Sequence, residues 1–170
     1  VGEIGSLTNW TSLKKNWANV SNTPYKYYKN WIYEGGIKTP LIVFWPEKIK
    51  KINSIIESPV HFIDFLPTFS EILELKYPEV YNGENIIPLS GESFWKKLIQ
   101  TDNLKRKNPL FWKWRDGKAI RYGKWKLTSH DNNWQLYNLK RDPTEINDLV
   151  LLKPRLNKKL QELYEKWYKN

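Results

Sequence analysis

The sequence predicts an α/β layer followed by a small antiparallel sheet packed against a C-terminal helix. Three observations support this fold class. Residues 37–45 form a short apolar run, residues 61–75 repeat apolar side chains every three or four positions, and from Pro109 the repeat changes to every second position. These patterns are typical of a strand buried on both faces, an amphipathic helix and half-buried antiparallel strands.

The first predicted elements are a polar loop over residues 1–26 and a buried strand over 37–45. The loop is rich in Gly, Ser, Thr and Asn, shows little periodicity and contains an Asn-Thr-Pro turn signal at 22–24. Long ordered loops often have a function. The strand contains the run Pro-Leu-Ile-Val-Phe-Trp and is bounded by Gly36 and Pro46.

A helix is predicted over 61–75, where Asp64 is suited to cap the start and Pro67 falls in the first turn. Its apolar face comprises Phe62, Phe65, Leu66, Phe69, Ile72 and Leu73. His61 precedes this helix, and a core or capping role is favoured for it over a catalytic one. Residues 77–108 follow as a polar connection.

Four short strands and a last helix complete the chain. The first predicted strand has Leu110, Trp112 and Trp114 on one face. The other three are predicted over 119–122, 124–128 and 134–139. Asp116-Gly117 is a hairpin turn signal between the first two. In the helix, Pro154 falls near the first position. One helix face, expected to cover the sheet, comprises Leu156, Leu160, Leu163 and Trp167.

Composition limits the class of protein. The 170 residues are enough for one domain, or for one small domain and part of another. Apolar residues make up 40%, including ten Trp, which is ample for a core. There is no Cys, which excludes thiolate nucleophiles and Cys-ligated metals, and no stretch approaches the roughly 20 apolar residues of a membrane span. The absence of Met, even at position 1, indicates a piece of a longer polypeptide.

The net charge of +10 favours anionic partners, although a general bias toward Lys, Asn and Ile explains it equally well. Trp alternates with Lys at 112–114 and 124–126, as it does where bases stack beside phosphate contacts. Half-buried strands show the same period of two. Core packing is therefore favoured, and nucleic acid is not expected as a partner.

The sequence contains no self-sufficient catalytic signature. His61 and His130 are its two histidines, and His130 is expected to be a loop residue. The HExxH, Walker, GxGxxG and GxSxG motifs are absent. Evidence for a chemical function therefore has to come from longer patterns.

Five segments, taken together and in order, carry a family resemblance. They are WANVSNTPYKYYKNWIYEGGIKTPLIVFWP, SPVHFIDFLPTFSEIL, GENIIPLSGESF, NPLFWKWRDGKAIRYGKWKL and WQLYNLKRDPTEINDL. The first has a lysine five positions before Glu-Gly-Gly, the second has His-x-x-Asp-x-x-Pro-Thr, and the third has Gly-x-x-x-x-Pro-x-x-Gly-x-Ser. In this order, over roughly Asn16 to Trp167, the chain resembles the arylsulfatase-type sulfatases.

The resemblance implies an alkaline-phosphatase-like fold, in which a large α/β domain precedes a smaller one. Residues 1–108 would be the C-terminal part of the catalytic α/β domain, and 109–170 the small C-terminal antiparallel-sheet and helix domain. The family's Cys/Ser-x-Pro-x-Arg segment, whose modified formylglycine is the nucleophile, is absent. A divalent cation, expected to be Ca²⁺, would likewise be bound upstream, and no metal ligand is assigned in this chain.

Lys29 matches the family's active-site lysine, because it lies five positions before Glu34. A fixed cation near the sulfuryl oxygens and the leaving group stabilises the transition state more than the ground state. The resemblance therefore implies that Lys29 is catalytic and binds substrate. Asn19, Asn22 and Tyr28 are predicted to line the substrate side of the same loop, with turn formation and packing as their alternative role. The two glycines after Glu34 are expected to permit a tight turn without Cβ clashes.

The resemblance thus implies a sulfatase that hydrolyses a small-molecule or carbohydrate sulfate monoester, with these 170 residues inactive on their own. Two alternatives stay open: a phosphodiester or phosphonate ester hydrolase of the same superfamily, and a non-enzymatic basic module that binds anionic polymers. A periplasmic or secreted location is expected from the resemblance.

Overall fold

The computed structural model describes residues 14–50, 53–100 and 105–169. They form two compact units, the first from the described parts of 1–40 and 111–170 and the second from 41–110. Each unit has its own helices and its own sheet. The assignment of catalytic and C-terminal domains on either side of residue 108 stays a prediction.

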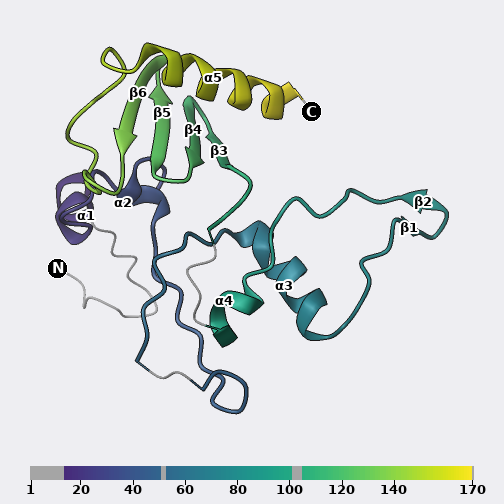
Figure 1. The fold of residues 1–170 in the computed structure, drawn as a ribbon. Helices are drawn as coiled ribbons and strands as arrows, with labels where there is room; N and C mark the ends of the chain where they lie inside the picture. The colour runs from purple at the N-terminus through teal and green to yellow at the C-terminus, as the bar shows by residue number, and fades with distance from the viewer. Residues whose placement is uncertain (1–13, 51–52, 101–104, 170) are drawn as a thin grey trace, which may run out of the picture. The chain divides into compact units, whose positions relative to one another are not determined.

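A four-stranded sheet is the central element of the first unit (Figure 1). Its strands are β3 (Leu110–Trp114), β4 (Gly117–Tyr122), β5 (Trp125–His130) and β6 (Asn133–Asn138), hydrogen-bonded in sequence order. The turn between β5 and β6 uses Asp131 and Asn132, whose φ angles of 51° and 63° suit a type I′ hairpin. The predicted antiparallel meander is confirmed.

One face of the sheet packs against α5 (Pro154–Lys169), the predicted C-terminal helix. Ile120, Leu127 and Leu136 lie opposite one another on β4, β5 and β6. They form a core cluster with Leu160 and Tyr164 of α5, and all five side chains are 0% exposed. This cluster is the main core of the first unit.

The apolar face of α5 extends along the helix on both sides of this cluster. Leu156 and Leu163 are half-buried against it, and Trp167 stacks on Phe111 with ring centroids 4.8 Å apart. The predicted helix face and its position on the sheet are therefore confirmed. Tyr164, which the sequence analysis did not assign to this face, is fully buried.

The opposite face of the sheet is covered by the N-terminal part of the chain. Arg121, Lys126 and Tyr137 form the next cross-strand row, and they point to this side because strand side chains alternate. Tyr33 forms a second buried cluster with Tyr137 and Leu139. The sheet therefore has an interior on both of its faces.

Two short helices belong to this covering segment, α1 (Lys15–Ser21) and α2 (Glu34–Ile37). Figure 1 shows both away from α5, with β5 and β6 between α2 and α5. The predicted polar loop over 1–26 is wrong where α1 forms, and its residues 1–13 lie outside the described residues. The helix lacks Gly and Pro but buries no side chain, so the sequence shows no apolar period for it.

The second unit contains three short helical elements. They are η1 (Phe62–Asp64), α3 (Phe65–Ile72) and α4 (Trp95–Gln100). The helix predicted from the apolar period is confirmed, and His61 has the predicted capping role, since its Nδ1 accepts the Ile63 N–H at 3.4 Å. Burial lowers the pKa of His61, which favours this neutral acceptor form. Phe65 and Phe94 pack edge to face with centroids 5.6 Å apart.

A small hairpin lies within the predicted polar connection of the second unit. Its strands are β1 (Val80–Tyr81) and β2 (Glu84–Asn85). Asn82 and Gly83, with φ angles of 50° and 84°, form the turn between them. The Asn-Gly dipeptide is the usual signal for such a turn, and the sequence analysis did not use it.

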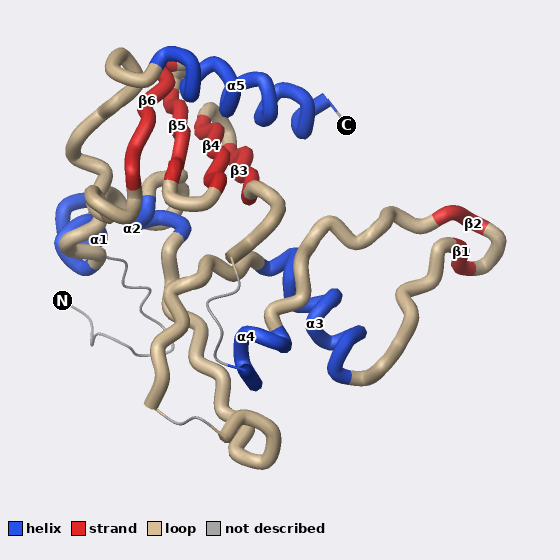
Figure 2. The backbone as a smooth tube through the Cα atoms, viewed as in Figure 1, coloured by secondary structure: helices blue, strands red, loops and turns tan. Residues whose placement is uncertain are grey.

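The predicted strand over 37–45 is wrong. Ile37 ends α2, and residues 38–45 follow a path without secondary structure (Figure 2). Ile42 and Phe44, expected in a core, are 88% and 87% exposed. A strand is stable only beside hydrogen-bonded neighbours, and no strand of the described residues pairs with this segment.

Candidate active-site loop

Lys29 lies in a tight turn between α1 and α2. The Trp31 N–H donates to the Tyr28 carbonyl at 3.1 Å, so Lys29 and Asn30 are the central residues of a β-turn. Asn30 has a φ of 81°, the left-handed conformation that a type II turn requires at its third position and that Asn tolerates. Lys29 is exposed and Tyr28 is half-buried. The turn therefore holds Lys29 on a defined backbone, and its catalytic role stays a prediction.

Asn19 and Asn22 hold the start of this turn. The Tyr27 N–H donates to Asn19 Oδ1 at 2.8 Å, and Asn22 Nδ2 donates to the Tyr27 carbonyl at 3.0 Å. Tyr27 has a φ of 63°, which is unfavourable for a bulky residue, and these two bonds stabilise it. Both asparagines therefore have the turn-forming role. Their contact with substrate, and that of Tyr28, stays a prediction.

Aromatic rings connect the turn to the sheet. Tyr27 and Trp31 stack with centroids 4.2 Å apart, and Trp31 lies 4.6 Å from the ring of His130. His130 is the last residue of β5, so its prediction as a loop residue is wrong. The Tyr33 hydroxyl hydrogen-bonds to Gln135 of β6, and burial raises the pKa of Tyr33 to about 12.

Gly35 and Gly36 are required because the backbone of the turn packs directly on them. A Cβ on Gly35 would lie 2.2 Å from the Lys26 carbonyl oxygen, and one on Gly36 would lie 2.0 Å from that of Trp31. The Gly35 N–H also donates to the Lys26 carbonyl at 3.0 Å. The glycines do prevent Cβ clashes as predicted, although they stand in a helix and not at the entry to a strand.

Glu34, just before these glycines, takes part in a buried ion cluster. Its Oε1 lies 2.9 Å from Lys126 Nζ, which is also 2.7 Å from Glu145 Oε1. The Glu34 backbone N–H donates to Glu145 Oε2 at 2.7 Å, and Arg121 lies 3.9 Å from the Glu34 carboxylate. The side chains of Glu34, Lys126 and Glu145 are 4%, 0% and 0% exposed, so these charges are removed from water.

The cluster joins three of the five sequence segments. Glu34 belongs to Glu-Gly-Gly, Lys126 to Gly-Lys-Trp-Lys-Leu and Glu145 to Asp-Pro-Thr-Glu. Burial raises the pKa of Glu145, and the nearby Lys126 opposes this effect. The sequence analysis missed Lys126, because a lysine beside a strand tryptophan usually faces water. The one available signal was that the segment with Lys126 resembles the sulfatase family together with the segments of Glu34 and Glu145.

A shallow hollow of about 410 Å³ lies beside the turn. Its lining includes hydroxyl, amide, aromatic and cationic side chains from two segments of the first unit. They are Asn19, Thr23, Pro24, Tyr25, Lys26, Tyr27, Thr144 and Ile146. Lys26 holds its ammonium over the rings of Tyr33 and Tyr137, at 5.5 Å and 5.3 Å from their centroids. Of the four predicted site residues, Asn19 lines the hollow.

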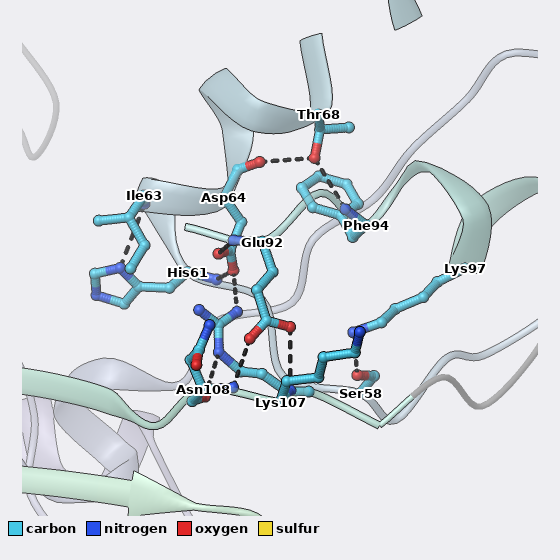
Figure 3. Close-up of polar contacts among 11 residues, drawn as sticks. Ser58, His61, Ile63, Asp64, Thr68, Glu92, Phe94, Lys97, Lys107 and Asn108 are labelled. Atoms are coloured by element: carbon cyan, nitrogen blue, oxygen red, sulfur yellow. Dashed lines mark hydrogen bonds and ion pairs between the residues drawn. The ribbon is translucent and has the colours of Figure 1, made fainter. Parts of the chain in front are cut away.

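Asp64 is the centre of a separate polar network in the second unit (Figure 3). Its Oδ2 lies 2.6 Å from Arg106, with both side chains buried, and also accepts the His61 N–H at 2.8 Å. Its Oδ1 accepts the Glu92 N–H at 2.8 Å. Asp64 does have a capping role, but at the third position of η1, where it forms a reciprocal capping box with His61; as the N-cap of α3 its side chain makes no cap bond.

Two further side chains extend the Asp64 network. The Glu92 carboxylate accepts the backbone N–H groups of Lys107 and Asn108 at 3.1 Å and 2.5 Å. Thr68 Oγ1 donates to the Asp64 carbonyl at 2.6 Å and accepts the Phe94 N–H at 3.0 Å. Figure 3 shows these bonds joining the η1–α3 segment to the chain on either side of α4. The network therefore has a structural role.

The fold and the family match identify this chain as the C-terminal region of a sulfatase. The solved structure of Ps i-CgsB in complex with k-i-k-neocarrahexaose is similar, with a TM-score of 0.73 and 27% identity. The similarity covers 85% of this chain and 32% of the Ps i-CgsB chain. A structure from work on glycosaminoglycan metabolism by Bacteroides thetaiotaomicron resembles this chain in fold, with a TM-score of 0.70, 24% identity and coverage of 84% of this chain and 31% of that one. The predicted alkaline-phosphatase-like fold class is confirmed.

The chain belongs to the family described as "N-sulphoglucosamine sulphohydrolase, C-terminal", whose model matches residues 24–169. An uncharacterized sulfatase of Schizosaccharomyces pombe is 26% identical over 96% of this chain and 30% of its own length. An N-acetylgalactosamine-6-O-sulfatase of Bacteroides thetaiotaomicron is 28% identical over 83% of this chain and 29% of its own length. The chain therefore spans less than a third of these relatives, and the resemblance to sulfatases is confirmed.

Sulfatases imply a metal cofactor, but the described residues do not fit one. No group of three or more His, Asp or Glu side chains in 14–50, 53–100 and 105–169 is placed to hold a metal ion. Asp64 is engaged by Arg106, and Glu34 and Glu145 are engaged by Lys126.

None of the described helices is long and apolar enough to cross a bilayer.

Proposed function

We propose that this chain is part of an enzyme that hydrolyses sulfate monoesters. The observation that carries the proposal is the family match over 24–169, which includes a lysine five positions before Glu34 on a hydrogen-bonded turn. Because the chain spans less than a third of its relatives, the activity is that of a longer protein. The 170 residues alone are inactive in this proposal.

Lys29 stabilises the reacting sulfate group in this proposal. As the ester S–O bond breaks, negative charge grows on the sulfuryl oxygens and on the departing oxygen. An ammonium group held near these atoms lowers the energy of the transition state more than that of the bound substrate. The β-turn and the asparagine bonds to Tyr27 support this role, because a fixed backbone reduces the reorganisation needed during the reaction.

The substrate class that we propose is a sulfated carbohydrate. Two of the similar proteins are described as an N-acetylgalactosamine-6-O-sulfatase and as a complex with k-i-k-neocarrahexaose. The hollow beside the turn supports this choice, since its Asn, Thr and Tyr side chains offer donors and acceptors for sugar hydroxyl groups. In this proposal Asn19 contacts the substrate from the hollow, and Asn22 and Tyr28 contact it from the loop that carries Lys29.

The nucleophile and the metal are carried by residues outside this chain in our proposal. The expected nucleophile is a formylglycine, and the expected cation is Ca²⁺. The described residues offer no ligand set for this cation. Mass spectrometry of the longer protein checks the modified residue, and elemental analysis identifies the bound ion.

The test is hydrolysis by the full-length protein of 4-nitrophenyl sulfate and of sulfated monosaccharides. Lys29→Ala is expected to lower kcat about a hundred- to a thousandfold, by analogy with removing one charge-stabilising group. Lys140→Ala is the matched control, because it removes an exposed lysine elsewhere in the first unit. An unchanged kcat in Lys29→Ala would contradict the assigned role.

The same assay separates the alternatives. Faster turnover of bis(4-nitrophenyl) phosphate or of a 4-nitrophenyl phosphonate ester than of the sulfate would favour a phosphodiester or phosphonate ester hydrolase. A salt-dependent affinity for sulfated glycan or nucleic acid, without any turnover, would favour a basic binding module. The family match and the fold support the sulfatase over both.

We also propose that the longer protein is exported, to the periplasm or outside the cell. The basis is the resemblance to sulfatases that act on carbohydrates. Cell fractionation with an antibody against this chain checks the location. Recovery of the protein in the cytoplasmic fraction alone would contradict it.

A further inference from the structure

The buried ion cluster and the Lys29 turn share one stretch of backbone. Glu34 is followed by Gly35 and Gly36, and the missing Cβ of Gly36 leaves room for the carbonyl groups of Tyr28 and Trp31, at the two ends of the turn. Glu34 is itself fixed at two points, its carboxylate by Lys126 and its N–H by Glu145. Any shift of Glu34 therefore displaces both ends of the turn.

Lys126 is the member on which the cluster depends. Among the described residues it is the cation in contact with both carboxylates, at 2.9 Å and 2.7 Å, whereas Arg121 lies near Glu34 alone, at 3.9 Å. Without Lys126, two carboxylates would converge in a site shielded from water. Like charges in such a site separate or take up a proton. Separation moves Glu34 from its position on Glu145, and protonation leaves the Glu34 carboxyl group without the ammonium that holds it.

We propose that Lys126 is a positioning residue for Lys29. Its ammonium holds Glu34 against Glu145, and this fixes the turn that presents Lys29 to the sulfate group. The inference rests on the proposed function, in which Lys29 contacts the substrate. Lys126 itself is 0% exposed and touches no substrate. A displacement of about 1 Å in a catalytic group can lower the rate by about a hundredfold.

The decisive experiment is a double-mutant cycle between the two lysines in the full-length protein. Lys126→Met is expected to lower kcat by about ten- to a hundredfold, with a smaller change in KM. In a Lys29→Ala background, the same substitution is expected to lower kcat by less than about threefold, because no ammonium is left to misplace. An equal loss in both backgrounds would overturn the inference, since a merely structural defect would act regardless of Lys29.

Two further variants control for charge and for folding. Lys124→Met removes the same charge two residues away from an exposed position, and kcat is expected to stay within about twofold of wild type. Lys126→Met/Glu145→Gln removes one cation and one carboxylate, which leaves Glu34 facing Arg121. If Lys126→Met does not fold, this double variant replaces it in the cycle. A folded double variant with wild-type kcat would overturn the inference.

Hydrogen exchange of the full-length protein supplies a measurement that does not require activity. The amides of Tyr27 and Trp31 are hydrogen-bonded within the turn region. Lys126→Met is expected to speed their exchange by at least about tenfold, and Lys124→Met is not. If no sulfate ester is hydrolysed, the proposed function fails while this measurement still decides whether the cluster holds the turn. Unchanged exchange would overturn the inference even in an active sulfatase.

Discussion

The two compact units differ in where their apolar side chains go. In the first unit the sheet is covered on both faces, and the central side chains of its main core are 0% exposed. In the second unit several large apolar side chains are 85–88% exposed, namely Ile42, Phe44, Phe62 and Ile87. Exposure on this scale usually marks a surface that contacts another part of a protein. The first unit builds a fully buried core cluster, although its Leu151 and Leu152 are 90% and 76% exposed, whereas the second unit leaves these four large side chains exposed despite the contact of Phe65 with Phe94.

Buried charges show a second difference between the units. The first unit joins three distant segments through one lysine and two carboxylates, and no other cation of its described residues contacts both carboxylates. In the second unit, Asp64 pairs with Arg106 and also accepts two backbone N–H groups. Loss of a cation should therefore be more damaging in the first unit than in the second.

The largest expected effect on stability is that of Lys126→Met. The substitution leaves two carboxylates buried without their shared cation, which typically costs about 3–5 kcal/mol of unfolding free energy. Arg106→Met in the second unit is the comparison. It should cost less, because the Asp64 carboxylate keeps its two N–H donors. Denaturant unfolding followed by circular dichroism measures both, and equal losses would contradict the distinction between the two networks.

Leu136→Ala comes next. Leu136 belongs to β6 and lies in the main core, with its side chain 0% exposed. Its truncation is expected to destabilise the first unit by about 2–5 kcal/mol, from lost burial and the cavity that remains. A loss below about 1 kcal/mol would mean that α5 closes over the gap, and the first unit would then be less tightly packed than its buried core indicates.

A smaller effect is expected at alkaline pH, and it belongs to the first unit. Burial raises the pKa of Tyr33 and of Tyr164 from 10.0 to about 12. Between these values the folded state keeps protons that the unfolded chain releases, so stability falls as pH rises. The unfolding free energy falls by at most about 1.4 kcal/mol per pH unit for each tyrosine. The stabilisation from each raised pKa is fully present below about pH 10. Unfolding at several pH values, with tyrosinate absorbance, measures this loss.

Tyr33→Phe tests the assignment of that effect. The variant has no group to ionise at this position, so its stability should fall less steeply between pH 10 and 12 than that of the wild type. The tyrosinate titration should also lose one late-ionising group. An unchanged slope would exclude Tyr33 as a source of the alkaline loss.

The smallest effect is expected for Phe44→Ser in the second unit. Phe44 is 87% exposed, so its side chain contributes little burial to the structure described here. The unfolding free energy of this chain should change by no more than about 0.5 kcal/mol. The matched measurement is Phe44→Ser in the full-length protein, where a loss of several kcal/mol would indicate that the longer protein buries this residue.

The parts of the fold that the sequence predicted are those in which local pattern and packing agree. The meander has alternating side chains and tight turns, and α5 has an apolar face that meets the sheet. The failures follow from a lack of partners or of a visible pattern. The run at 37–45 has the composition of a buried strand but no neighbouring strand, within 14–50, 53–100 and 105–169, to bond with. The helix α1 buries nothing and so leaves no apolar period.

The candidate site shows the same limit. The spacing of Lys29 from Glu34 could be seen in the sequence, and so could the need for two glycines beside it. The burial of Lys126 could not, because strand alternation predicts an exposed side chain when only one sheet face is covered. The contacts of Asn19 and Asn22 with Tyr27 depend on an unusual backbone angle that no local pattern indicates.

The sequence distances within the ion cluster have a consequence for how the protein is made. Glu34 is 92 residues from Lys126 and 111 residues from Glu145. Contacts between such distant residues form late, because they close long loops of chain. On the ribosome, the lysine turn emerges well before its anchors do. A nascent chain that stops short of Glu145 would therefore carry Lys29 on an unsupported segment, and the geometry of this turn depends on synthesis that continues past Glu145.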